Sequence, residues 1–206
     1  MAKVFPVRFW LLCAGVLLAS CTGCLSKPTG PAHETPSRGP AEDYERSDPW
    51  VLVDSAQDRM VVYKKGSAPL IFQNIAVGAA GVKEKIRRGD DVTPRGVYRV
   101  AWIRNQSKFS RFIGLNYPSR VDAQRGLEAG RIDRQLYERI LRAHVLGEVP
   151  PQDTPLGGFI GIHGVGRGSL EVHRLANWTG GCIALENNQI HLLSELVTIG
   201  TIVEIR

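Results

Sequence analysis

Residues 158–164 read GFIGIHG, and residues 177–185 read NWTGGCIAL. The first run is apolar and ends in a His-Gly pair, which is typical of a buried strand. The second places Cys182 directly after two glycines. A thiol is weakly ionised near neutral pH, and a nearby imidazole can take its proton and return it to a leaving amine. The two runs therefore predict a cysteine nucleophile, Cys182, and a histidine base, His163.

The surroundings of Cys182 support a reactive thiol. The chain has four cysteines, and Cys182 is the only one within residues 50–206. It has no partner for a disulfide inside that segment, although a buried inert cysteine is the commoner fate of a lone thiol. Because Gly180 and Gly181 let the backbone approach closely, we expect their N–H groups, with that of Cys182, to face a developing oxyanion. Paired with an imidazole, the thiol is expected to have a pKa below the free value of about 8.5.

The order of these motifs resembles a known enzyme family. The arrangement of IHG, a loop and [Ser/Thr]-x-Gly-Cys-aliphatic resembles the signature of the YkuD-type L,D-transpeptidases. Residues 93–98, TPRGVY, resemble the TPxGxY element that lies upstream in that family. The resemblance covers residues 50–206 and implies a mainly β, β-sandwich-like catalytic domain.

The resemblance also implies roles for single residues. Cys182 matches the family nucleophile, His163 its general base, and Gly164 the residue whose backbone carbonyl orients that histidine. Gly181 belongs to the catalytic motif, and Thr179 matches its Ser/Thr.

Two positions depart from the usual family pattern. Gly180 stands where most members have a second histidine, and Ala184 stands where many have Arg or Asn. The chain is therefore more similar to the divergent YafK-like branch, and Gly180 and Thr179 are the residues expected on the substrate-binding side.

The resemblance implies acyl transfer on peptidoglycan, in cell-wall biogenesis or cell-shape control. The nucleophile attacks the carbonyl of the L-centred third residue of a stem tetrapeptide, the terminal D-Ala leaves, and an amine of another stem or of a protein takes the acyl group. Two alternatives stay open: a hydrolase that uses the same residues to cut links to peptidoglycan, and a catalytically silent wall-binding lipoprotein.

Other sites have weaker support. His173 also precedes Cys182 and is the rival base, but no glycine follows it and its surroundings read as a loop or short strand. His163, His173 and Cys182 lack the short spacings of a zinc signature. Residues 164–168, GVGRG, lack the helix and third glycine of a dinucleotide loop. We therefore expect neither a metal nor a cofactor.

Outside these motifs, the sequence predicts a mainly β domain with a helical insertion and a helix near its end. The expected strands form a hairpin of residues 50–54 and 59–65, an apolar run at 69–77, and a type I turn over 93–96 that leads into a strand. Helical periodicity appears at 133–146, before a glycine, and at 187–197, where Asn187 is the expected cap. Residues 201–205 are the expected last strand.

The N-terminus predicts export. Residues 1–20 combine positive charges, an apolar stretch and small residues, which is typical of a signal peptide. The sequence LASC at 18–21 resembles a bacterial lipobox, so Cys21 is the expected lipid attachment site. Residues 21–49 are rich in Pro, Gly and Ser and form the expected tether before a catalytic domain at 50–206. The expected location is a membrane facing the periplasm, and Thr22 resembles outer-membrane sorting.

The net charge of +6 favours an acidic partner. An exported protein without a nucleic-acid motif is better matched to an anionic cell-wall polymer than to nucleic acid. The expected partners are peptidoglycan stem peptides and, through the lipid, a membrane. The basic cluster Lys83, Lys85, Arg87 and Arg88 is interpreted either as a solvated loop or as part of this attraction.

Overall fold

The computed structural model describes residues 48–206. The predicted signal peptide, the lipid site Cys21 and the tether up to residue 47 lie outside the described residues. In chain order the elements are β1 (Trp50–Asp54), η1 (Ser55–Gln57), β2 (Arg59–Tyr63), β3 (Leu70–Gln73), β4 (Val82–Lys83), β5 (Thr93–Pro94), β6 (Gly96–Ser107), β7 (Ser110–Leu115), α1 (Arg120–Glu128), α2 (Arg134–Leu146), β8 (Gly161–Gly164), α3 (Leu170–Leu175), β9 (Ile183–Leu185), α4 (Asn187–Leu196) and β10 (Ile202–Ile205).

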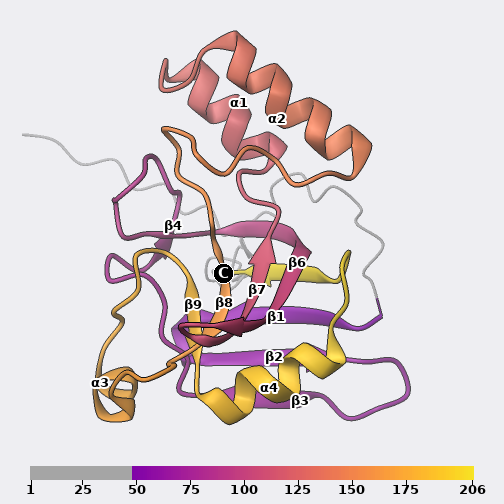
Figure 1. Ribbon diagram of the computed structural model, residues 1–206, viewed down its shortest axis with the longest axis vertical. Helices are drawn as coiled ribbons and strands as arrows, with labels where there is room; N and C mark the ends of the chain where they lie inside the picture. Colours follow the sequence, from indigo (N-terminus) through magenta and orange to yellow (C-terminus); the bar gives the residue numbers. More distant parts are fainter. Residues whose placement is uncertain (1–47) are drawn as a thin grey trace, which may run out of the picture. The chain divides into compact units, whose positions relative to one another are not determined.

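The strands form one mixed eight-stranded sheet in the order β3-β2-β1-β10-β6-β7-β8-β9 (Figure 1). The predicted hairpin is confirmed, because β1 and β2 pair antiparallel. The predicted last strand is also confirmed: β10 lies between β1 and β6, parallel to the first and antiparallel to the second. The short strands β4 and β5 form a separate parallel pair. The expected mainly β domain, with a helical insertion and a helix near its end, is therefore confirmed, and its sheet is open.

The long strand β6 belongs to two halves of the sheet. Its residues 96–99 pair with β10, whereas Val100 and the residues after it pair with β7 through two register shifts. Buried side chains from both halves, such as Met60 and Ile183, share one hydrophobic core. Ile190 and Leu193 of α4 join this core, and α4 packs on β7 and β8. The two catalytic motifs thus lie on the half of the sheet that α4 supports.

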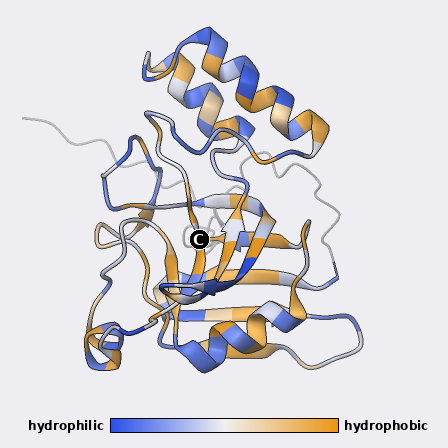
Figure 2. Cartoon of the chain, in the orientation of Figure 1, coloured by the Kyte–Doolittle hydropathy of each residue, from blue (hydrophilic) through white to orange (hydrophobic). Residues whose placement is uncertain are grey.

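The helical insertion has a small core of its own. The helices α1 and α2 lie side by side in Figure 1, and Figure 2 shows apolar and polar residues alternating along both. Ile140 of α2 is fully buried and packs in one cluster with Ala123, Ile132 and Leu156. The predicted helix α2 is confirmed with its caps, since Asp133 accepts a hydrogen bond from the Leu136 N–H at 2.7 Å and Gly147 ends it with a φ of 69°.

Three local predictions are wrong. The type I turn over residues 93–96 is replaced by the extended strand β5 and by the start of β6 at Gly96. The segment around His173 is not a loop or strand but the helix α3, capped by the Ser169 side chain. The cap of α4 is Glu186, while Asn187 instead bonds both the N–H and the carbonyl of Gly166, at 2.8 and 2.9 Å.

Within residues 48–206, no helix has both the length and the apolar character required to cross a membrane.

Candidate active site

The pairing of β8 with its neighbours brings the two catalytic motifs together. On one side of β8, His163 lies opposite Phe112 of β7, and on the other it lies opposite Ala184 of the parallel strand β9. Cys182 precedes Ala184 by two positions. His163 and Ala184 are therefore neighbours in the sheet, and Cys182 lies in the loop that leads into β9. The structure thus brings the two motifs together, and within residues 48–206 the Cys182 thiol bonds the Phe159 carbonyl rather than the His163 ring.

The His163 ring is held in one orientation. Its Nδ1 lies 2.7 Å from the Gly164 carbonyl oxygen, which can only accept, so Nδ1 carries the proton and Nε2 keeps the lone pair. The ring stacks on Phe109 at a centroid distance of 4.3 Å and meets the edge of Trp178 at 5.8 Å. The predicted orienting role of the Gly164 carbonyl has the geometry it requires.

The protonation state of His163 follows from its burial. The residue is 3% exposed, and burial lowers its pKa below 6.5, against the Gly164 carbonyl, which favours the charged ring. His173 and Lys108 add to the lowering through their charge. The imidazole is therefore neutral at neutral pH, with Nε2 ready to accept a proton.

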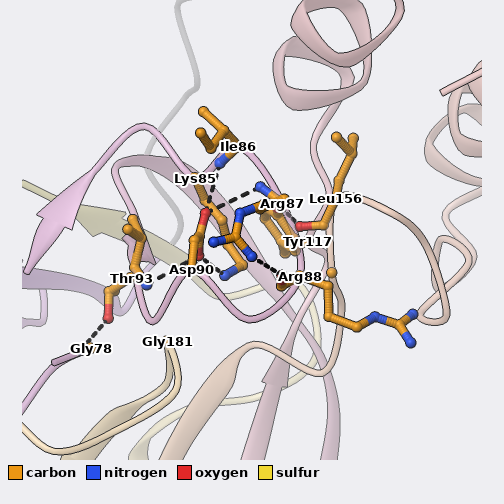
Figure 3. Close-up of polar contacts among 12 residues, drawn as sticks. Gly78, Lys85, Ile86, Arg87, Arg88, Asp90, Thr93, Tyr117, Leu156 and Gly181 are labelled. Atoms are coloured by element: carbon orange, nitrogen blue, oxygen red, sulfur yellow. Dashed lines mark hydrogen bonds and ion pairs between the residues drawn. The ribbon is translucent and has the colours of Figure 1, made fainter. Parts of the chain in front are cut away.

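Two buried threonines hold the backbone of the nucleophile. The carbonyl oxygen of Cys182 accepts hydrogen bonds from Thr179 Oγ1 at 2.6 Å and from Thr93 Oγ1 at 3.3 Å. Each hydroxyl also accepts one: Thr179 from the Gly181 N–H at 3.1 Å, and Thr93 from the Gly78 N–H at 2.8 Å (Figure 3). Thr179, expected on the substrate-binding side, thus acts here as an anchor of the loop. Sequence reasoning did not assign Thr93 a role, although the TPxGxY element marks it.

The thiol is neutral in this arrangement. Cys182 Sγ donates a hydrogen bond to the Phe159 carbonyl oxygen at 3.4 Å. Burial raises the pKa of the Cys182 thiol to about 11, although a backbone hydrogen bond at Gly161 and the charge of Lys85 act in the opposite direction. The expectation of a pKa below the free value is therefore wrong for the free protein, because the surroundings penalise a thiolate more than they stabilise it.

A strained residue, Phe159, lies beside the thiol. Its φ of 55° is in the left-handed region, which is uncommon for an aromatic residue. The conformation is held by a 2.7 Å hydrogen bond from its N–H to Gln152 Oε1, and its side chain is 60% exposed. Strain of this kind gathers at functional sites. No sequence signal pointed to Phe159, since it depends on a contact made only in the folded chain.

Comparison with known proteins identifies the family. A family model described as YkuD, L,D-transpeptidase catalytic domain, matches residues 48–205. The chain belongs to the YkuD family. No curated protein matches it.

Several solved structures are similar to this YkuD chain. Bd1075 of Bdellovibrio bacteriovorus has 19% identity and a TM-score of 0.49, with 80% of this chain and 50% of that one covered. The helical cell shape determining protein Pgp2 of Campylobacter jejuni has 19% identity, a TM-score of 0.44 and coverages of 78% and 48%. An L,D-transpeptidase mutant of Enterococcus faecium has 15% identity, a TM-score of 0.46 and coverages of 78% and 50%. The chain spans about half the length of each.

The two glycines before the nucleophile differ in their constraints. Gly181 has a φ of 131°, and a Cβ there would lie 2.7 Å from the Val92 carbonyl oxygen, so the YkuD loop requires glycine at this position. Its N–H is engaged with Thr179, so it is not free for an oxyanion. At Gly180 a Cβ would meet only Asp91 Oδ1, at 3.7 Å. The position where most family members have a second histidine is therefore open space.

The remaining histidines face other partners. His173 is 2% exposed, and its Nδ1 accepts a hydrogen bond from Trp178 Nε1 at 3.3 Å. His173 thus contacts Trp178, the residue that also contacts the His163 ring. His144 bonds the Pro118 carbonyl, and His191 bonds Ser110. Among residues 48–206, His, Cys, Asp and Glu side chains form no group of three or more that could hold a metal ion.

The raised thiol pKa predicts how Cys182 responds to pH. With a thiol pKa of about 11, the reactive thiolate is a small fraction of Cys182 at any pH well below 11. Alkylation by iodoacetamide should therefore accelerate about tenfold for each pH unit between 7 and 10. The rate is measured by mass spectrometry on the peptide that contains Cys182, which separates it from the N-terminal cysteines. A rate that is already maximal at pH 6 to 7 would show a preformed thiolate and imidazolium pair and contradict the neutral thiol.

Proposed function

We propose that this protein is a peptidoglycan L,D-transpeptidase that uses Cys182 as nucleophile and His163 as general base. The observation that supports the proposal is the pairing of β8 with β9, which sets His163 opposite Ala184 and next to the loop of Cys182, together with an imidazole whose Nε2 keeps a lone pair. Membership of the YkuD family supports the same chemistry.

In the first step the protein cleaves the donor peptide. Cys182 Sγ forms a bond to the carbonyl carbon of the L-centred third residue while its proton passes to His163 Nε2. The C–N bond to the terminal D-Ala then breaks, and the same proton goes to the leaving amine. Because both groups start neutral, the proton moves during the attack, and no thiolate has to persist in the buried site. The Cys182 N–H is the donor that we assign to the developing oxyanion, since the Gly181 N–H is occupied.

In the second step an amine releases the acyl group. Its nitrogen attacks the thioester carbon and gives its proton to His163, the C–S bond breaks, and the proton returns to sulfur. An amine of another stem peptide gives a crosslink, and a lysine of a protein gives attachment to the wall. Water in place of the amine gives hydrolysis.

The proposed location follows from the N-terminal sequence. We place the protein outside the cytoplasm, with residues 1–20 as a cleaved signal, a lipid on Cys21 and residues 21–49 as the tether. In this proposal the tether lets the catalytic domain reach a polymer beyond the membrane surface.

The function is tested with a purified stem tetrapeptide and an amine acceptor, scored by mass spectrometry for crosslinked, hydrolysed and unchanged peptide. Cys182→Ser should abolish turnover, because a hydroxyl is a far weaker nucleophile. His163→Ala should slow turnover by about 10²- to 10⁴-fold. His191→Ala, an exposed histidine, is the matched control and should change little. Unchanged turnover in His163→Ala together with a loss in His173→Ala would move the base to His173, and unchanged peptide with the intact protein would support the silent wall-binding alternative.

The lipid anchor has its own test. Cys21→Ala should leave the protein without a lipid, so that it separates from membranes after a salt wash while the unmodified chain stays bound. Membrane association of the Cys21→Ala variant after the wash would mean that another segment anchors the protein.

A further inference from the structure

A hollow of about 230 Å³ opens beside the nucleophile. Its walls include Phe159, whose carbonyl accepts the thiol hydrogen bond, and Gly180, which lies two positions before Cys182. On its other side it is lined by Lys85 and Arg88 from the loop that precedes β5. The hollow thus shares Phe159 with the hydrogen bond of the thiol, and it is large enough for a single amino-acid residue.

Lys85 is a buried cation fixed in the wall of this hollow. Its side chain is 3% exposed and forms an ion pair with Asp90 (Figure 3). The Asp90 carboxylate also accepts the backbone N–H groups of Ile86, Arg87 and Val92 at 2.9 to 3.1 Å. The interpretation of this basic cluster as a solvated loop is therefore wrong for Lys85, whose charge has a defined position.

The charges of the pair have different surroundings. Burial by itself would raise the pKa of Asp90, but the Lys85 ammonium and the three backbone N–H groups outweigh it and lower the pKa. The Asp90 carboxylate is thus ionised, and its hydrogen bonds are made within its own loop. Lys85 lines the hollow, whereas Asp90 does not. An ammonium has three donors and Asp90 Oδ1 uses one, so Lys85 can also bind a ligand.

Residues of a neighbouring loop pack closely against the aliphatic part of the Lys85 side chain. Gly157 has a φ of 100°, and a Cβ there would lie 3.0 Å from Lys85 Cε. The same Cβ would lie 3.9 Å from Tyr117 Cε1, and the Tyr117 hydroxyl donates a hydrogen bond to the Leu156 carbonyl at 2.8 Å. Arg88, at the rim, is ion-paired with Asp153, and both side chains are largely exposed, so water screens this pair. Lys85 is therefore the buried cation among the residues that line the hollow.

We infer that this hollow binds a carboxylate of the donor peptide and that Lys85 is the residue that recognises it. The inference rests on the proposed function. Consecutive Cα atoms are about 3.8 Å apart, so a carboxylate one residue away from the attacked carbonyl falls within reach of a cavity that begins at Phe159 and Gly180. A donor offers this group in two places: the terminal carboxylate of the leaving residue, or a side-chain carboxylate on the third residue.

The first test uses charge and does not depend on turnover. Iodoacetate and iodoacetamide both react with the Cys182 thiolate, so the ratio of their rates at one pH cancels the thiol pKa and reports the field that acts on the reagent. Lys85→Met keeps the buried stem and removes the charge, and it should lower the iodoacetate to iodoacetamide ratio about three- to tenfold. Lys85→Arg should retain the ratio. Arg87→Met, which removes an exposed charge of the same loop, is the matched control. An equal ratio in the intact protein and in Lys85→Met overturns the inference.

A second measurement needs no substitution, so it stands even if Lys85→Met folds poorly. D-Alanine should slow the alkylation of Cys182 by iodoacetamide in the full chain, whereas D-alaninamide, without the carboxylate, should not. Equal protection by the two compounds, or none by either, overturns the inference.

The source of the carboxylate is then assigned with tetrapeptide donors. Amidation of the terminal carboxylate, or of the third-residue side-chain carboxylate, should raise KM about tenfold or more in the arm that matches the hollow, and Lys85→Met should remove that difference. Unchanged KM in both arms overturns the inference. If the peptides are not turned over but the reagent ratio still depends on Lys85, the proposed function fails and the anion-binding hollow stands.

Discussion

The structure depends on the parallel pairing of β8 with β9. This pairing sets His163 opposite Ala184, so that the loop with Cys182, two positions earlier, enters β9 next to the imidazole strand. A shift of one residue in the register would turn the side chains of β9 to the opposite face. The register is fixed at several points: Thr93 and Thr179 grip the Cys182 carbonyl, and the bridge between Ala76 and Ala184 covers the outer edge of β9. The core beneath, shared by both halves of the sheet and by α4, packs against this edge.

The same burial that orders the site keeps its two reactive groups uncharged. The pKa of His163 is lowered and that of Cys182 is raised, so the free protein holds a neutral ring and a neutral thiol. A neutral thiol and a neutral ring react slowly with electrophiles at neutral pH. The sulfur becomes nucleophilic when it attacks a bound carbonyl while the ring accepts its proton. The fixed charge of Lys85 acts against the burial and favours negative charge near the thiol.

Local patterns in the sequence predicted much of the fold. The β1–β2 hairpin, α2 with its two caps and the final strand each have a signal that lies within the element itself. The family resemblance implied that the Gly164 carbonyl orients His163, and the structure has the hydrogen bond that this role requires. The failures share a physical cause, because they depend on contacts between distant segments. The role of Thr93 appears only when β5 meets the Cys182 loop, and Phe159 is held by Gln152 across a turn. Lys85 looked like one charge among several until the fold buried it against Asp90. The pKa of the thiol likewise depends on how the whole site is buried, which no motif encodes.

The central claim is that Cys182 carries the acyl group between donor and acceptor. Its most direct test is the intact mass of the full chain after mixing with a stem tetrapeptide and no amine, quenched before water can release the product. The account predicts a mass increase equal to the donor without its terminal residue, located on the peptide that contains Cys182 and absent from Cys182→Ala. Consumption of the donor with no adduct on Cys182, or the same adduct on the Cys182→Ala variant, would contradict it.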